Sequence, residues 1–246
     1  TDARYCPDCG QSTAVRRLAM WTILRDFPGV VLNVDRGFLY NVVQLATRPG
    51  YAIKDYLDGR RRPFQHPLSF MLIILGAMLL AMNLMEVHYY DPAQDAWMSP
   101  AQDAFWREYD ATQQSWIHDY KFFIPFYLPW MALLYCLWLR ALGQRYTYAE
   151  GICISFFNSA QMTAPQILVL ALVYVAGSAR FARLADAAIN LPILLTLWSV
   201  QLYQLGSPAL PKARRVLLAV TGSVLLGVFS YAMIILFLTF MRRFAT

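Results

Sequence analysis

Cysteine spacing near the start of the chain suggests metal binding. Cys6 and Cys9 form a Cys-x-x-Cys pair followed by Gly10, which places two thiolates on a tight turn, as in one half of a zinc knuckle. Structural zinc takes four ligands, and Cys136 and Cys153 lie too far along the chain, inside apolar segments, to supply the others. We expect Cys6 and Cys9 to hold a structural zinc together with ligands from elsewhere. A redox-active or vestigial pair is the alternative.

A run of three arginines suggests recognition of anionic lipid. Arg60, Arg61 and Arg62 follow Gly59 and stand just before the first long apolar segment. Guanidinium groups at the entrance to a membrane attract lipid phosphates, each contributing about 1 kcal/mol near the surface. They also hold their end of the segment in the cytoplasm. The alternatives are a plain topology anchor, or an internal clasp in which the arginines pair with nearby aspartates.

Polar residues inside an apolar segment form the third candidate site. Glu150, Asn158 and Gln161 project at neighbouring angles of one expected helix. Polar groups in a membrane span are costly and usually face protein or water. They are therefore a candidate intramembrane polar site, with hydrogen bonds between helices as the alternative role.

The histidines and carboxylates do not complete a catalytic set. The sequence has only His66, His88 and His118, and no HExxH motif, Ser-His-Asp set or paired-carboxylate motif can be assembled from it. His88 and His118 lie among acidic residues, but their spacing fits no metal-ligand motif. We expect a protein that is not an enzyme.

Composition indicates a membrane protein. Of the 246 residues 58% are hydrophobic and only 15% are charged, against about 25% charged in ordinary soluble domains. The net charge of +6 comes from short basic clusters beside apolar runs, so we expect no nucleic-acid partner. Four cysteines with one close pair do not form a disulfide framework, which favours a reducing compartment for the N-terminus.

The segment before the first apolar run is predicted to form helices that lie at the membrane interface. Residues 16–27 and 36–48 each place apolar side chains on one side of a helix, with Asn41 among the residues off the apolar face of the second. Pro49 and Gly50 should stop that helix, and a short helix over 52–57 should end at Gly59. We divide the chain into a zinc-ribbon remnant (1–14), cytoplasmic or interfacial amphipathic helices (15–65) and a membrane domain (66–246).

One stretch resembles a known family. The residues DRGFLYNVVQLATRPGYAIKDYLDGRRRPFQHPLSF (35–70), preceded by YCPDCGQ, resemble the bacterial membrane-protein family called domain of unknown function 3667. The resemblance implies several transmembrane helices behind a small zinc ribbon, with a first Cys-x-x-Cys upstream of the one present here. It implies no established activity.

Five apolar segments are long enough to be membrane spans. We therefore expect an all-α bundle of about five transmembrane helices, with spans near 67–85, 122–139, 148–177, 187–203 and 216–241. Pro165 should kink or tilt the third, and Gly222, Ser223, Gly227 and Ser230 should permit close contact by the fifth. Residues 86–121 carry seven acidic and two basic side chains, so we expect an external loop, with a helix opened by Ser99 as N-cap.

Charge places the N-terminus in the cytoplasm of a bacterial inner membrane. Five spans would then leave Arg180 and Arg183, and also Arg242 and Arg243, on the outer side, against the usual bias of basic residues. The leading hypothesis is a non-enzymatic membrane adaptor or scaffold whose zinc ribbon recruits a cytosolic protein or a second copy, and whose arginines bind anionic lipid. The rival is a transporter of a small molecule or lipid that uses Glu150, Asn158 and Gln161.

Overall fold

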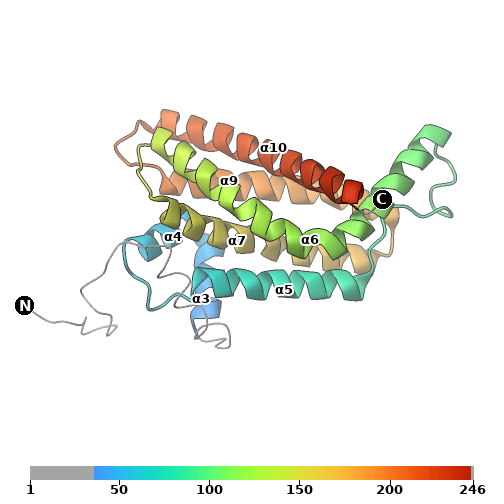
Figure 1. Ribbon diagram of the computed structural model, residues 1–246, viewed down its shortest axis with the longest axis horizontal. Helices are drawn as coiled ribbons and strands as arrows, with labels where there is room; N and C mark the ends of the chain where they lie inside the picture. Colours follow the sequence, from blue (N-terminus) through green and yellow to red (C-terminus); the bar gives the residue numbers. More distant parts are fainter. Residues whose placement is uncertain (1–35, 245–246) are drawn as a thin grey trace, which may run out of the picture.

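The computed structural model describes residues 36–244, which form a bundle of helices (Figure 1). The segment with Cys6 and Cys9 and the helix expected over 16–27 lie outside the described residues. Within the described part no strand is present. The helices are α3 (Arg36–Thr47), α4 (Pro49–Leu57), α5 (Pro67–Met85), α6 (Pro100–Ala141), α7 (Tyr148–Ala176), α8 (Ala179–Ala185), the π-helix η1 (Asp186–Asn190), α9 (Leu191–Leu205) and α10 (Lys212–Phe244).

The long helices run side by side along the longest axis, and α3 crosses them near the start of α5 (Figure 1). Four apolar helical stretches of the described residues are long enough to cross a membrane: Pro67–Met85, Tyr148–Ala176, Ala179–Leu205 and Lys212–Phe237. The all-α, membrane-spanning architecture is thereby confirmed. The apolar part of α6, Phe126–Ala141, is shorter than these four. The C-terminal ends of α5 and α7 lie together at one end of the bundle, so α6 between them must run in the opposite direction along it.

The boundary expected between an external loop and a second span is wrong. Ser99 does cap a helix, because its side chain accepts from the backbone N–H of Gln102 and the Gln102 side chain accepts from the N–H of Ser99. That helix continues without a break to Ala141. The acidic segment after Ser99 is therefore the first half of α6 rather than a separate loop.

The fourth apolar stretch contains a widened turn. It begins at Ala179, earlier than the predicted residue 187, and passes through η1 before Pro192. Proline lacks a backbone N–H and crowds the preceding turn, and a π-helical turn accommodates that loss. The third stretch is one helix from Tyr148 to Ala176 although Pro165 lies inside it, and Gly177 ends it with φ +58°.

The helix α4 is part of the core and does not only lie on its surface. Ala52, Ile53, Tyr56 and Leu57 are buried in the same cluster as Phe70 of α5 and residues of α6, α7 and α9. Pro49 and Gly50 do separate α3 from α4, but α4 begins at Pro49 itself, since proline suits the first turn of a helix.

In α3 Asn41 lies off the exposed apolar side, as predicted, and it is fully buried. The opposite side of α3 exposes Leu39, Val42 and Val43. The helix is therefore held to the bundle by a polar residue and presents apolar residues outward.

Small residues of α10 do permit close contact, as predicted. A side chain at Gly222 would overlap the indole of Trp138 in α6. Ser223 is buried and its hydroxyl lies 2.8 Å from that of Ser199, while the Ser230 hydroxyl lies 2.8 Å from that of Tyr127. At Gly227 an added Cβ would meet Trp198 at an ordinary 3.4 Å.

Candidate functional site

The arginine motif follows the end of α4. Gly59 adopts φ +111°, a conformation that L-residues with side chains rarely take, and turns the chain toward Arg60, Arg61 and Arg62. The Arg60 side chain is 65% exposed. Arg61 Nε donates to the carbonyl of Tyr56 at 3.4 Å, and its guanidinium lies 5.8 Å from the centre of the Tyr56 ring. The motif is thus anchored at Arg61 and open to solvent at Arg60 and Arg62.

Asp55 partly neutralises this motif. Its Oδ2 lies 3.1 Å from Arg48 Nη2 and 3.7 Å from Arg60 Nη1. The internal clasp considered as an alternative is therefore present at Arg60, in an exposed and weak form. One carboxylate between two guanidiniums leaves the group with net positive charge.

Other basic loops lie at the same end of the bundle. The backbone N–H of Ser207, after α9, donates to the carbonyl of Leu142, after α6, at 2.9 Å. Burial, together with the nearby Asp58 and Glu150 carboxylates, raises the pKa of Tyr146 in the α6–α7 loop to about 12. Together these contacts place the following cations with the arginine motif at what we call the basic end: Arg140, Arg145, Lys212, Arg214 and Arg215.

Two contacts fix the segment that carries the motif. The Asn41 amide donates to the Gln65 carbonyl and accepts from the Gln65 N–H, both at 3.2 Å. A Cβ at Gly37 would lie 2.7 Å from Gln65 N, so only glycine allows this approach of α3. Both contacts are made at Gln65, so they hold the C-terminal end of the segment that contains Arg60 to Arg62.

A second anchor joins α4 to α9. Gln204 Oε1 accepts from the N–H of Gly50 at 2.8 Å, which satisfies an unpaired donor in the first turn of α4. A Cβ at Gly50 would lie 2.5 Å from the Gln201 carbonyl. The Thr-Arg-Pro-Gly sequence therefore builds a helix start that packs directly on α9.

The structure does not join Glu150 to the other two residues of the predicted intramembrane site. Glu150 lies in the first turn of α7, where its carboxylate accepts from the Thr147 N–H at 2.7 Å and the Thr147 hydroxyl accepts from the Glu150 N–H. This is a capping box, a structural role that the sequence Thr-x-x-Glu signals.

Asn158 and Gln161 lie deeper in α7, both buried. Asn158 Oδ1 accepts from Trp198 Nε1 of α9 at 2.7 Å, which is the expected hydrogen bond between helices. Among the described residues neither polar atom of Gln161 has a hydrogen-bond partner, and the same is true of buried Gln201 in α9. The spacing of residues along one helix does not reveal Gln201, because it carries no information about partners on other helices.

At the opposite end, which we call the acidic end, Arg183 is paired. Its guanidinium donates to both carboxylate oxygens of Asp95, at 2.7 and 2.9 Å, and to the Tyr89 carbonyl at 2.6 Å. It also lies 5.0 Å from the centre of the Trp106 ring. The hydrogen bonds from Arg183 hold the pKa of Asp95 below its usual value despite burial. Arg183 is thus buried and paired with the acidic segment. An outer position for this arginine would therefore not conflict with the usual bias of basic residues toward the cytoplasm.

His88 pairs with Asp110 at this end. Its Nδ1 lies 3.1 Å from Asp110 Oδ2, and Asp110 Oδ1 accepts from the Tyr89 N–H. Among the residues whose placement is described, no group of three or more metal-ligating side chains is present.

The fold and its charge distribution define a helical bundle of the membrane-spanning type. Residues 35–79 match the family model described as "Protein of unknown function (DUF3667)", which confirms the resemblance over α3, α4 and most of α5. No curated protein and no solved structure matches the chain.

Proposed function

We propose that this protein is a non-enzymatic membrane scaffold whose basic end binds anionic lipid headgroups through Arg60, Arg61 and Arg62. The observation that carries the proposal is the fixed position of these arginines, which Asn41 and Gly59 set beside the start of α5. Their charge is reinforced by the cations of two other loops at the same end. A lipid phosphate at this position would meet several guanidinium donors at once.

The exposed side of α3 supports the same placement. Leu39, Val42 and Val43 face outward on a helix that crosses the start of α5 (Figure 1). Apolar residues there would enter the boundary between headgroups and acyl chains. On this basis the basic end lies at the cytoplasmic face of a bacterial inner membrane.

The N-terminal segment completes the proposal. Cys6 and Cys9 would bind zinc with ligands from elsewhere, and the metal-bound segment would recruit a cytosolic protein or a second copy of the chain. Metal analysis of the chain and of its Cys6→Ser, Cys9→Ser variant tests this part, since the variant should lose bound zinc.

Lipid analysis tests the arginine motif. Replacing Arg60, Arg61 and Arg62 by glutamine should lower anionic lipid retained by the purified protein at least tenfold, because each cation contributes about 1 kcal/mol. Lysine replacements should restore part of the binding, since an ammonium lacks the guanidinium's forked donors. Arg107→Gln, at the exposed acidic end, is the control and should change nothing.

Asp55→Asn gives the opposite expectation. It releases Arg48 and Arg60 and should raise lipid retention. Unchanged lipid in the glutamine variant, together with faster proteolysis between Arg36 and Gln65, would instead make the motif an internal clasp.

A transporter is the second candidate, favoured by Gln161 and Gln201. Buried amides without partners cost several kcal/mol unless water or a ligand reaches them in another conformation. Cysteine at either position should react with a membrane-impermeant thiol reagent if the bundle opens to water. Cysteine at buried Ala160 is the matched control. Equal protection of all three positions would exclude this route.

A further inference from the structure

A cavity of about 690 Å³ opens at the basic end, where α6 turns into α7. Its lining residues are Arg140, Gly143, Arg145, Tyr146 and Thr147. Two of them are arginines and none is acidic, so the wall of the cavity carries positive charge. Arg140 forms no ion pair with another residue of the described part of the chain, which leaves its charge available to a ligand.

The cavity lies close to the arginine motif. The carboxylate of Asp58, two residues before Arg60, is near enough to Tyr146 to raise its pKa. In Figure 1 the α6–α7 loop leads to the start of α7 directly beside α4. Consecutive Cα atoms are about 3.8 Å apart, so Arg60 and Arg145 each lie within a short distance of this contact. One lipid headgroup can therefore reach both groups of arginines.

Tyr146 supplies a neutral donor between the two groups. Its pKa is raised to about 12, so its hydroxyl stays protonated near neutral pH. A protonated hydroxyl can donate a hydrogen bond to a phosphate oxygen and does not repel it. Asp58 and Glu150, the carboxylates near this tyrosine, are outnumbered by the five arginines of the motif and the cavity. The region thus remains suited to an anion.

A further guanidinium adds positive charge at the neighbouring α9–α10 loop. The Arg215 guanidinium lies 4.0 Å from the centre of the Tyr203 ring, and an added Cβ at Gly206 would lie 3.2 Å from its side-chain carbons. Its Nε is buried and has no hydrogen-bond partner among the described residues. Stacking on a ring holds a guanidinium without neutralising it. The hydrogen bond from Ser207 to Leu142 brings this charge beside the α6–α7 loop.

An exposed apolar strip on α6 leads to the cavity. Leu133 and Leu137 are 41% and 49% exposed and precede Arg140 at helical spacing. Residues three or four apart lie on the same side of a helix, so these side chains and Arg140 form one line. Such a strip fits an acyl chain, which a soluble phosphate compound lacks. The geometry therefore favours a lipid over a soluble anion.

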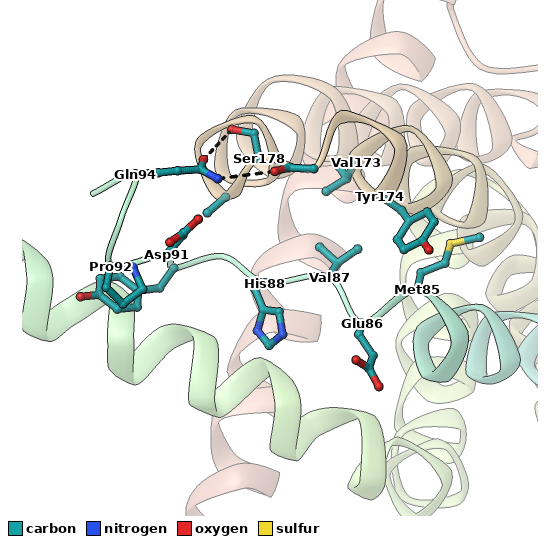
Figure 2. Close-up of a pocket in the computed structure, with 13 residues that line it drawn as sticks. Met85, Glu86, Val87, His88, Asp91, Pro92, Gln94, Val173, Tyr174 and Ser178 are labelled. Carbon is teal, nitrogen blue, oxygen red and sulfur yellow. Dashed lines mark hydrogen bonds between the residues drawn. The ribbon is translucent and has the colours of Figure 1, made fainter. Parts of the chain in front are cut away.

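The cavity at the acidic end has the opposite charge. Glu86 and Asp91 line it, and no lysine or arginine is among its lining residues. Their carboxylates point in different directions (Figure 2). A phosphate group would be repelled there, so anionic headgroups are expected at the basic end and not at the acidic end.

We propose that the basic end binds a lipid whose headgroup carries two phosphates, as cardiolipin does. One phosphate lies at Arg60 to Arg62 and the other at Arg140 and Arg145, with an acyl chain along Leu133 and Leu137. The inference rests on the proposed function, because the arginine motif provides the first phosphate site. Two linked phosphates bind more tightly than two separate ones, since the first to bind holds the second at a high effective concentration.

Native mass spectrometry of the purified protein in detergent tests the proposal with two lipids. Cardiolipin should bind at least tenfold more tightly than phosphatidylglycerol, which has one phosphate, when the two are compared at equal phosphate concentration. Equal affinities would overturn the two-phosphate site and leave the proposed function intact. Binding of neither lipid would overturn both.

Variants separate the two phosphate sites. Arg140→Gln combined with Arg145→Gln should lower the cardiolipin affinity at least tenfold, while phosphatidylglycerol still binds at the arginine motif and shows that the variant is folded. Glutamine at Arg60 to Arg62 should weaken both lipids. Arg107→Gln combined with Arg180→Gln removes two exposed arginines from the acidic end and should change neither affinity. Equal losses in the two double variants would reduce the effect to net charge and overturn the site.

Pyrophosphate identifies the source of the two phosphates. It carries two linked phosphates without acyl chains, so at the concentration of the lipid it should not displace bound cardiolipin. Displacement by pyrophosphate would contradict a lipid and would assign the site to a soluble diphosphate.

Discussion

The carboxylate of Asp95 and the guanidinium of Arg183 form a two-pronged ion pair that joins the segment after α5 to α8. Both side chains are nearly inaccessible to solvent, at 1% and 9%. The pair fixes the connection between the end of α5 and the start of α6 against α8. It therefore stabilises the acidic end of the bundle.

Breaking this pair should destabilise the protein. Asp95→Asn should lower the free energy of unfolding by about 3 kcal/mol, because the Arg183 charge then stays buried without its partner. The double variant Asp95→Leu, Arg183→Met should recover much of that loss. Asp103→Asn at the exposed Asp103–Arg107 pair is the control, with an expected change below about 1 kcal/mol. Denaturant titration in detergent measures all three.

The same pair predicts a dependence on pH. The pKa of Asp95 is lowered in the folded state. Its contribution to the free energy of unfolding is therefore present above its unfolded pKa and is lost as the pH falls through the folded pKa. Between pH 7 and about 5 the contribution should be constant. Unfolding in stronger acid should be steeper for the wild type than for Asp95→Asn. Parallel acid titrations of the two proteins would contradict this assignment.

Gly50 should be intolerant of a side chain. Gly50→Ala places a methyl group against the backbone of α9 and should cost about 1–3 kcal/mol, as overpacking does. Gly76→Ala is the matched control, because nothing lies within 4 Å of an added Cβ and alanine favours a helix. Thermal unfolding should separate the two variants. Equal midpoints would mean that α4 does not pack on α9 as described.

Gln201 should be replaceable by an apolar residue with a gain in stability. Gln201→Leu removes two buried polar atoms without partners and should stabilise the bundle by about 1–3 kcal/mol. Asn158→Leu is the contrast, because it leaves Trp198 Nε1 without its acceptor and should destabilise. A loss of stability in Gln201→Leu would show that this amide has a partner in the membrane.

The two ends of the bundle should lie on opposite sides of the membrane. A cysteine at Ser99 should react with an impermeant thiol reagent in spheroplasts, and a cysteine at Gln144 should react only after the membrane is opened. The buried Cys136 and Cys153 are expected to stay unmodified. Labelling of the Gln144 variant from outside would reverse the orientation.

The sequence by itself determined the helical membrane class, the position of α5, the capping box at Ser99 and the glycine contact at Gly222. Each follows from local chemistry: apolar length, a capping side chain or a missing Cβ. The 42-residue length of α6 was not visible, because the change from polar to apolar residues near 122 does not interrupt the backbone hydrogen bonds of a helix.

Only the tertiary structure decided the partners of the polar residues. Glu150, Asn158 and Gln161 share a helix, yet Glu150 caps it, Asn158 bonds to Trp198, and Gln161 has no hydrogen-bond partner within the part of the chain that the structure describes. In the sequence Arg183 does not fit the charge pattern. The structure explains this, because Arg183 pairs with Asp95, which lies 88 residues away along the chain. A hydrogen bond or ion pair depends on distances between elements, and the spacing of residues along one element does not contain those distances.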